Sequence, residues 1–513
     1  MLPRGAAPGP PRGAGRGRPA RRRQGPRGVR DRAGARGPPR AGLRGGERHV
    51  IQPIAFAPPR PAGKEAPARV ALVTLGCAKN LVDSEIMAGL MARGGFVLTA
   101  NPADADVAVV NTCAFIGPSQ KESIDRILEL AALKREGVLR GLIVAGCLAQ
   151  RYQSELLREI PEVDAVVGTG QVDAIARVAH RVRHGGAAIL EVGPPGTAVD
   201  LASHRAVSTP RHLAYLRIAD GCDFRCTFCI IPKLRGDLRS RPFESVLEEA
   251  HRLAEGGVKE LLLIAQDSTS YGEDIYGTAR LPELLRGLAA IDGIEWLRVH
   301  YTHPKTWSEE LIRVFEEEPK VCRYVDIPLQ HVTDRMLRRM RREVVAVEQE
   351  RLIETLRRRL PEIAIRTHFI VGFPGETEED FEALLEAVGR ESYDHVGCFA
   401  YSREDGTPAG RMGEQVPERT KLERRRRLMA AQRDLAARVW GRWVGRTVDV
   451  RIDGAVPSRA GSFIGRVEQQ GYEVDGVTRV RAVRGAPEPR AGERTRVRIV
   501  RARHYDLEAE VTG

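Results

Sequence analysis

The stretch GCDFRCTFC at residues 221–229 spaces three cysteines as Cys-x-x-x-Cys-x-x-Cys. Cysteine thiolates hold iron–sulfur clusters, and three of them can bind three irons of one cubane, which leaves the fourth iron open to a chelating ligand. Phe228, between the last two cysteines, can shield such a cluster. A structural zinc site is the alternative, but zinc prefers four closed ligands and no fourth Cys or His lies nearby. We therefore predict that Cys222, Cys226 and Cys229 hold an iron–sulfur cluster.

The positive charge of the chain lies in one segment. The 513 residues carry a formal charge of +13, yet residues 1–67 hold 16 Lys and Arg against 3 Asp and Glu, and the remainder holds 65 of each. Residues 1–67 are rich in Arg, Gly, Pro and Ala and have little to bury, which predicts a disordered basic tail. We interpret it as a dispensable extension, with a nucleic-acid arm or a transit peptide as alternatives. The neutral body gives no argument for nucleic-acid binding.

The length fits three domains. No apolar run approaches the roughly 18 residues that a membrane helix needs, and nothing in the sequence suggests secretion. We therefore expect a soluble, cytoplasmic protein that does not contact a membrane. In that setting, metal or redox chemistry is a better use of eight cysteines than a disulfide framework.

Residues 68–195 alternate apolar runs with helical segments, the first of them from about Asp83 to Arg93, which predicts a doubly wound parallel sheet. Cys77, Cys113 and Cys147 each stand just past the end of a predicted strand. In open α/β sheets, ligands bind outside the carboxyl ends of the strands. A single buried cysteine is usually just a small apolar residue, but three at equivalent positions predict a second cluster.

Residues 208–437 follow a linker rich in Pro and Gly and contain six further strand–helix units, so we predict a partial TIM-type barrel. Residues 440–508 change to short strands separated by glycines, which predicts a small antiparallel β-barrel. The helix between them carries four consecutive arginines at residues 424–427, which we interpret as a solvated face. Cys322 and Cys398 have no ligand-like neighbours and are predicted to be core cysteines.

From Val70 to Asp506 the chain resembles the radical S-adenosylmethionine (SAM) methylthiotransferases. The resemblance rests on the central cysteine motif and on LGCAKNLVDSE at 75–85, NTCAFI at 111–116, GCLAQRY at 146–152 and IPLQH at 327–331. Within this family it is most similar to the branch that modifies the β-carbon of an aspartate in the small-subunit ribosomal protein S-twelve. The branch that acts on isopentenyladenosine in tRNA is the alternative.

An iron–sulfur RNA-binding or scaffold protein without activity is a third interpretation. The complete cysteine triplet and the Pro-Gly-Glu segment at 374–376 argue against it. SAM turnover to deoxyadenosine would separate it from both enzyme classes.

The resemblance implies two 4Fe–4S clusters. Cys222, Cys226 and Cys229, here called the SAM-cluster cysteines, match the ligands of the cluster that cleaves SAM. The auxiliary cysteines, Cys77, Cys113 and Cys147, match the ligands of an auxiliary cluster that carries sulfur. Candidate SAM contacts lie at predicted strand ends, although each is as readily a turn residue: Gln266, Asp267, Gly372 and Glu376.

The C-terminal barrel resembles a TRAM domain, which in this family contacts the macromolecular substrate. Residues 440–513 hold 14 Lys and Arg against 10 Asp and Glu, and they include the acidic segment at 473–475. We interpret this mild charge as favouring a basic ribosomal protein over tRNA, because phosphate contacts demand a strongly basic face. The chain departs from the family at Glu343, where glycine is usual, and the segment at 466–470 is also divergent.

Overall fold

The computed structural model describes residues 49–50, 67–196, 205–390, 393–483, 485 and 487–512. Apart from His49, Val50 and Pro67, the predicted tail at 1–67 lies outside the described residues. Among the helices described, none combines the length and the apolar character that crossing a membrane requires.

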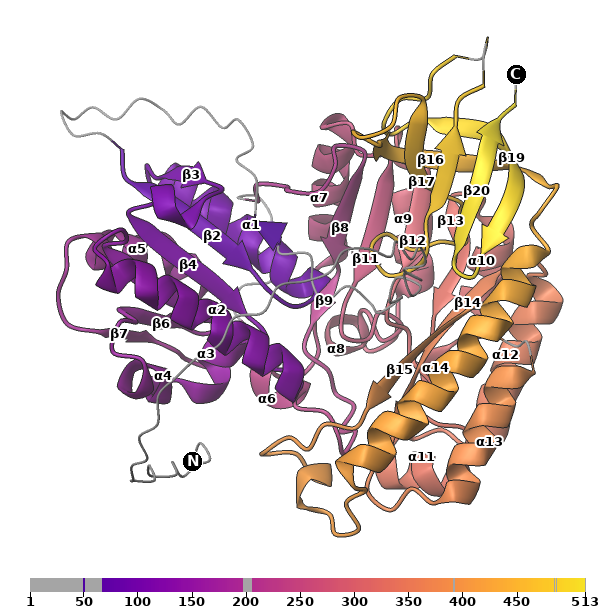
Figure 1. The fold of residues 1–513 in the computed structure, drawn as a ribbon, viewed down its shortest axis with the longest axis horizontal. Coiled ribbons are helices and arrows are strands. Elements are labelled where there is room, and N and C mark those ends of the chain that lie inside the picture. Colours follow the sequence, from indigo (N-terminus) through magenta and orange to yellow (C-terminus); the bar gives the residue numbers. More distant parts are fainter. Residues whose placement is uncertain are drawn as a thin grey trace, which may run out of the picture. The chain divides into compact units, whose positions relative to one another are not determined.

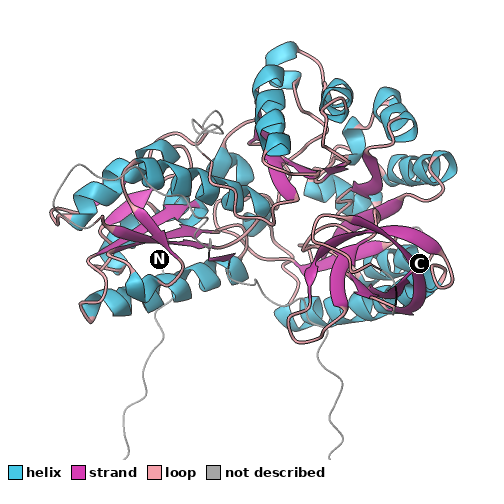
Figure 2. Cartoon of the chain, turned by 90° about the horizontal axis from the view of Figure 1, so that it is seen from above, coloured by secondary structure: helices cyan, strands magenta, loops and turns pink. Residues whose placement is uncertain are grey.

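A parallel sheet with helices on both faces forms the N-terminal part (Figures 1 and 2). Its strand order is β1-β2-β4-β5-β6-β7, β3 also pairs with β2, and every pair except β1–β2 is parallel. The strands are β1 (His49–Val50), β2 (Arg69–Thr74), β3 (Val97–Thr99), β4 (Val107–Thr112), β5 (Gly141–Gly146), β6 (Ala165–Val167) and β7 (Ile189–Glu191). The helices are α1 (Ala78–Arg93), α2 (Gly117–Arg135), α3 (Cys147–Tyr152), α4 (Ser154–Glu159) and α5 (Ile175–Arg183).

Alternate residues of β2 enter two different cores. Val70 and Leu72 pack with residues of α1 and α5, whereas Ala71 and Val73 pack on the side of α2. A strand that is buried on both faces reads as a continuous apolar run, which is why the sequence predicts this sheet. The first turns of α1 were not predicted, because their buried residues are polar and hide the helical periodicity.

The central part is an open sheet of six parallel strands in the order β8-β11-β12-β13-β14-β15, which confirms the predicted partial barrel. The strands are β8 (Leu213–Arg217), β11 (Glu260–Ile264), β12 (Trp296–Val299), β13 (Val321–Asp326), β14 (Ala364–Val371) and β15 (His395–Ala400). Its helices are α6 (Ile231–Arg235), α7 (Phe243–Glu255), α8 (Glu273–Tyr276), α9 (Leu281–Ala289), α10 (Glu309–Glu317), α11 (Asp334–Met340), α12 (Ala346–Arg359), α13 (Glu378–Gly389) and α14 (Glu418–Gly441). A short ribbon of β9 (Ala219–Asp220) and β10 (Arg239–Ser240) flanks the cysteine loop.

The C-terminal part is a closed barrel in the order β16-β17-β18-β20-β19, with Trp440 of α14 in its core. Its strands are β16 (Thr447–Ala455), β17 (Ser462–Arg466), β18 (Thr478–Arg481), β19 (Arg494–Arg503) and β20 (Asp506–Val511). The predicted barrel is confirmed, but β18 and β20 pair in parallel, whereas the other neighbours are antiparallel as predicted.

The arginine run on α14 is more than a solvated face. Arg424 is 6% exposed, and its two terminal nitrogens pair with Glu376 and Glu378 at 2.8 and 2.9 Å. Arg427 pairs with Glu378 at 2.8 Å. Arg425 and Arg426 stay exposed. The prediction was therefore wrong for Arg424, because a carboxylate buried at the end of β14 requires a buried partner.

The acidic segment at 473–475 does not present Asp475 to a partner. The carboxylate of Asp475 is 2% exposed and pairs with Arg366 at 3.1 Å, and it accepts a hydrogen bond from Tyr324 at 2.8 Å. The divergent Arg466 is also buried and pairs with Glu260 of β11 at 2.8 Å. These groups join the barrel to the central sheet. Asp475 is therefore not available to a basic substrate and does not support the charge argument for one.

Candidate active site

Cys77 and Cys113 flank the point at which the strand order of the N-terminal sheet reverses. β3 lies on one side of β2 and β4 on the other. Ligand sites of open parallel sheets form at such switch points, outside the carboxyl ends of the strands. Cys77 follows β2, Cys113 follows β4, and Cys147 opens α3 directly after β5. The topology therefore brings the three auxiliary cysteines to one edge.

The auxiliary thiols lie close enough to influence one another. Burial, followed by the neighbouring thiols of Cys147 and Cys77, raises the pKa of Cys113 to about 12. Cys113 and Cys147 are 8% and 6% exposed, whereas Cys77 is open to solvent. Buried thiols must lose their protons to bind a metal, so metal binding here releases protons and becomes easier as the pH rises.

Asn80 of α1 fixes the three auxiliary loops. Its Nδ2 donates to Leu75 O and Thr112 O, both at 2.9 Å, and these carbonyls precede the first two cysteines. Its Oδ1 accepts from Cys147 Sγ at 3.8 Å. The side chain is 1% exposed, and burial of an amide requires such partners. Sequence reasoning missed this role, because it began α1 after Asn80.

Two glycines permit the close packing of these loops. Gly76 and Gly146, directly before the first and third auxiliary cysteines, have φ values of 95° and 88°. A Cβ on Gly76 would lie 2.8 Å from Cys113 Cβ, and one on Gly146 would lie 2.2 Å from Asn111 Oδ1. A left-handed backbone with no room for a side chain accepts only glycine.

Gly76→Ala is therefore expected to lower the iron bound after anaerobic reconstitution, because the new methyl group displaces Cys113. Gly95→Ala is the matched control, since Gly95 has a φ of 86° and no neighbour within 4 Å of a built Cβ. Both variants carry the left-handed backbone cost of about 1–2 kcal/mol, which thermal unfolding measures. Full iron content in Gly76→Ala would contradict the steric role.

The SAM-cluster cysteines lie on a loop that closes on itself. Cys222 N–H donates to Gly236 O at 3.1 Å, and Cys229 N–H donates to Cys226 O at 3.0 Å. Burial raises the pKa of Cys222 and of Cys229 to about 12. Phe228 packs against an apolar cluster at the end of β14.

Arg342, which sequence reasoning did not single out, stands beside this loop. Its Nη1 donates to Cys226 Sγ at 3.6 Å and its Nη2 donates to Pro328 O at 2.7 Å. The residue is 5% exposed, and its Nε has no hydrogen-bond partner among the described residues.

The donor set of the cysteine loop is sulfur alone, which is the chemistry of iron–sulfur ligation by cysteine thiolates. Within the described residues, no group of three or more His, Cys, Asp or Glu side chains is arranged to hold a single metal ion.

Gln266 and Asp267 follow β11 beside the cysteine loop. Gln266 Nε2 donates to Asp220 Oδ1 at 2.6 Å, whereas its buried Oε1 has no partner among the described residues. Asp267 accepts from Thr269 N–H at 3.0 Å and from Ser270 Oγ at 2.7 Å. The orphaned amide oxygen fits a donor of a bound ligand, and Asp267 mainly orders its own turn.

A cavity of about 280 Å³ joins Cys222 to Asp267 and is also lined by Lys305 and Glu343. Lys305 and Glu343 pair across its rim at 2.7 Å. Glu343 has a φ of 53°, a left-handed conformation that costs a non-glycine residue energy and that accounts for the glycine usual in the family at this position.

Gly372 and Glu376 follow β14 and bind each other. Glu376 Oε2 accepts from Gly372 N–H at 2.6 Å, and Oε1 accepts from Arg424 at 2.8 Å. Burial raises the pKa of Glu376 to about 7, against the opposing charge of Arg424. Gly372 has a φ of 72°, and a Cβ there would lie 2.3 Å from Lys421. This geometry fits the turn interpretation of both residues.

Orphaned imidazole nitrogens gather at the carboxyl ends of the central strands. The Nε2 atoms of His300, His303 and His331 are buried and have no partner among the described residues. His303 stacks on Phe224 of the cysteine loop, with ring centroids 3.8 Å apart. Buried polar atoms without partners are rare in native proteins, so these atoms are candidate contacts for a ligand bound at this edge.

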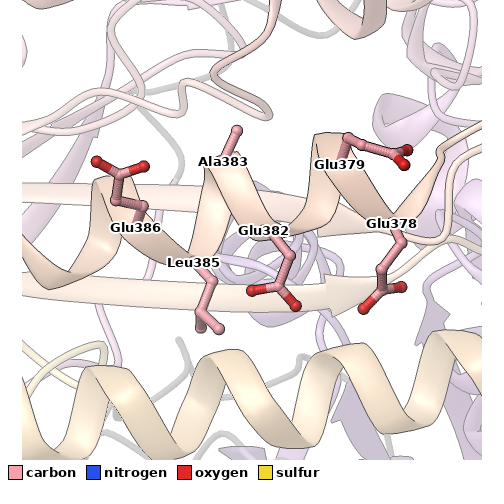
Figure 3. A pocket seen from close by; sticks show the side chains of 6 residues that line it. All are labelled: Glu378, Glu379, Glu382, Ala383, Leu385 and Glu386. Carbon is pink, nitrogen blue, oxygen red and sulfur yellow. The ribbon is translucent and has the colours of Figure 1, made fainter.

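A larger groove, of about 720 Å³, lies along α13 (Figure 3). Four glutamates line it: Glu378, Glu379, Glu382 and Glu386. Glu378 and Glu382 pair with Arg427 of α14, and Glu386 pairs with Arg390. None of the predicted site residues lines this groove, and it is not part of the candidate site.

Three family models match consecutive parts of the chain. The model described as "Uncharacterized protein family UPF0004" matches residues 69–168, that of the Radical SAM superfamily matches residues 216–388, and that of the TRAM domain matches residues 444–512. The two cysteine triplets fall in the first and second of these segments.

Curated relatives match almost over their whole length. A "Ribosomal protein uS12 methylthiotransferase RimO" of Heliobacterium modesticaldum is 48% identical over 442 residues, which cover 86% of this chain and 95% of that protein. One of Symbiobacterium thermophilum is 47% identical, with 87% and 91% covered. Among solved structures, the radical S-adenosylmethionine methyltransferase TsrM of Kitasatospora setae aligns with a TM-score of 0.48 at 17% identity, covering 67% of this chain and 75% of that chain.

Proposed function

This chain belongs to the family of ribosomal protein uS12 methylthiotransferases, and we propose that it adds a methylthio group to the β-carbon of an aspartate in ribosomal protein uS12. The observation that carries the function is the match itself, at 48% identity across 95% of a relative with that name. Eight such relatives lie between 44% and 48% identity. The tRNA alternative is not favoured.

Membership of the radical SAM superfamily implies a 4Fe–4S cluster and SAM. When bound, this pair supplies a deoxyadenosyl radical, which removes a hydrogen atom that is too weakly acidic for a side-chain base. We assign the irons to Cys222, Cys226 and Cys229. Arg342 holds Cys226 Sγ in place, and the orphaned Gln266 Oε1 is suited to accept a hydrogen bond from the SAM amino group.

We further propose that Cys77, Cys113 and Cys147 hold a second 4Fe–4S cluster. Its support is the position of the three thiols at the switch point and the frame that Asn80 builds around them. Two of the three thiols, Cys113 and Cys147, are buried, whereas Cys77 stays open to solvent. In such a reaction SAM would also supply the methyl group.

The substrate is tested by offering purified uS12 and tRNA side by side under anaerobic, reducing conditions. We expect the mass of one methylthio group on an aspartate of uS12 and none on tRNA, as read by mass spectrometry of both products. A reaction without SAM is the control. Modification of tRNA alone would transfer the assignment to the isopentenyladenosine branch.

A further inference from the structure

A buried network of charged side chains crosses from the N-terminal sheet to the central sheet beside the auxiliary cysteines. Arg235 is 2% exposed. Its Nη2 donates to Asp83 Oδ2 and to Asn80 Oδ1, both at 2.7 Å, and its Nη1 donates to Asp220 Oδ2 at 3.1 Å. Arg217 pairs with Asp83 as well. Buried ions need such partners, because an unpaired buried charge is costly.

The helix that follows the SAM-cluster loop places Arg235 in this network. α6 begins just after Cys229, and Arg235 is its last residue. Leu234 enters the core on one face of the N-terminal sheet, and Cys222 N–H donates to Gly236 O at 3.1 Å. The short segment from Cys229 to Arg235 therefore links the two cysteine sites physically.

The guanidinium of Arg235 reaches the auxiliary site through Asn80. Asn80 Oδ1 accepts from Arg235 at 2.7 Å and from Cys147 Sγ at 3.8 Å, so cation and thiol share one acceptor. Arg235 is thus the positive group that faces this thiol across the two sheets.

The charge of the network suits an anionic cluster. It contains two buried cations, Arg217 and Arg235, and two buried carboxylates, Asp83 and Asp220. The buried Lys79 lies within electrostatic range of Arg235 and Asp220. Thiolate ligands add negative charge to a bound cluster, and reduction adds one more. A nearby cation stabilises the reduced form, and local charge and hydrogen bonds to sulfur set the reduction potential of such clusters.

We propose that Arg235 is a positioning residue of the auxiliary site and that its charge raises the reduction potential of the cluster held there. The inference rests on the second cluster of the proposed function and adds a cation that the SAM-cluster loop supplies. Arg235 acts through Asn80 and through its field, without touching the substrate.

The test is a potentiometric titration, followed by electron paramagnetic resonance, of the full chain with Cys222, Cys226 and Cys229 replaced by alanine. The auxiliary cluster is then the one to be observed. Arg235→Gln should lower the midpoint potential of this cluster by at least about 59 mV, which for a one-electron couple is a tenfold change in the equilibrium constant for reduction. Asp83→Asn, which removes a negative charge from the same network, should raise it. Simple loosening of the site would move both variants in one direction.

Arg241→Gln is the matched control. Arg241 is 1% exposed and pairs with Glu249 rather than with Asp83, so its loss should destabilise the fold without moving the midpoint. An unchanged midpoint in Arg235→Gln, or an equal shift in Arg241→Gln, overturns the inference.

If Arg235→Gln fails to hold iron, Arg235→Lys and Asp83→Asn decide the matter. Arg235→Lys keeps the charge, so its midpoint potential should stay near that of the parent, and Asp83→Asn should shift the midpoint upward. These two results together support the inference, and any other pattern overturns it. A parent that binds no iron refutes the second cluster and this inference with it. Methylthio transfer to uS12 by the unmodified chain tests the proposed function separately.

Discussion

Replacing the three auxiliary cysteines by alanine is expected to lower the iron of the anaerobically reconstituted protein from about eight to about four per chain, the content of one four-iron cluster. Cys77, Cys113 and Cys147 follow neighbouring parallel strands at one edge, and Asn80 fixes their loops. No single remaining thiol can replace three ligands in that frame. Iron and sulfide analysis of the same sample, with the visible absorption spectrum, measures the loss.

The control for this prediction is a variant with Cys322→Ala and Cys398→Ala. Both residues are buried, at 1% and 3% exposure, and burial raises the pKa of each to about 12. Cys322 packs among Trp296 and Tyr324. This variant should keep about eight irons and lose about 1–2 kcal/mol of stability. Eight irons in the auxiliary triple variant would refute the second cluster.

The sequence predicts the framework of both sites because parallel sheets leave a strong pattern. Val70, Leu72 and their neighbours in β2 are buried on both faces, so the strand appears as an unbroken apolar run. Once such strands are placed, their carboxyl ends follow, and with them the shared edge of Cys77, Cys113 and Cys147. This inference needs only topology, not contacts.

The contacts themselves depend on partners that are distant in sequence. Asn80 and Asp83 bind Arg235 at 2.7 Å each, and no local pattern pairs α1 with the end of α6. The contact between Arg342 and Cys226 could not be predicted for the same reason, because the two residues are distant in sequence. In the C-terminal barrel, β18 alternates buried Thr478 and Val480 with exposed arginines, a short period-two signal that the surrounding polar sequence hides.

Charge counts proved the weakest guide. The acidic segment at 473–475 was interpreted as facing a basic partner, yet Asp475 pairs with Arg366 inside the protein. Likewise, Arg424 neutralises Glu376 rather than facing solvent. A formal charge becomes a surface property only where the structure leaves it unpaired, so the substrate assignment rests on family membership instead.

The two cysteine triplets are expected to have separable effects on turnover. Cys226→Ala should reduce deoxyadenosine formation from SAM to the level without protein and should abolish methylthio transfer, because an open iron for SAM requires the complete SAM-cluster triplet. The auxiliary triple variant should still form deoxyadenosine, since its SAM-cluster loop is closed by its own hydrogen bonds, from Cys222 to Gly236 and from Cys229 to Cys226. It should give no methylthio product on uS12.

Both products are measured in one reaction by liquid chromatography with mass spectrometry, so that a loss of folding cannot imitate a loss of chemistry. The auxiliary triple variant is its own control, because deoxyadenosine shows that its central part is folded and loaded. Reductive SAM cleavage by Cys226→Ala would refute the assignment of Cys222, Cys226 and Cys229 to the cluster that cleaves SAM. Methylthio product from the auxiliary triple variant would show that sulfur reaches uS12 without the second cluster. Retained SAM cleavage with lost methylthio transfer is the one pattern that requires two clusters with different roles. We expect this pattern because the two triplets lie in different places, one after β8 and the other at the edge of the N-terminal sheet.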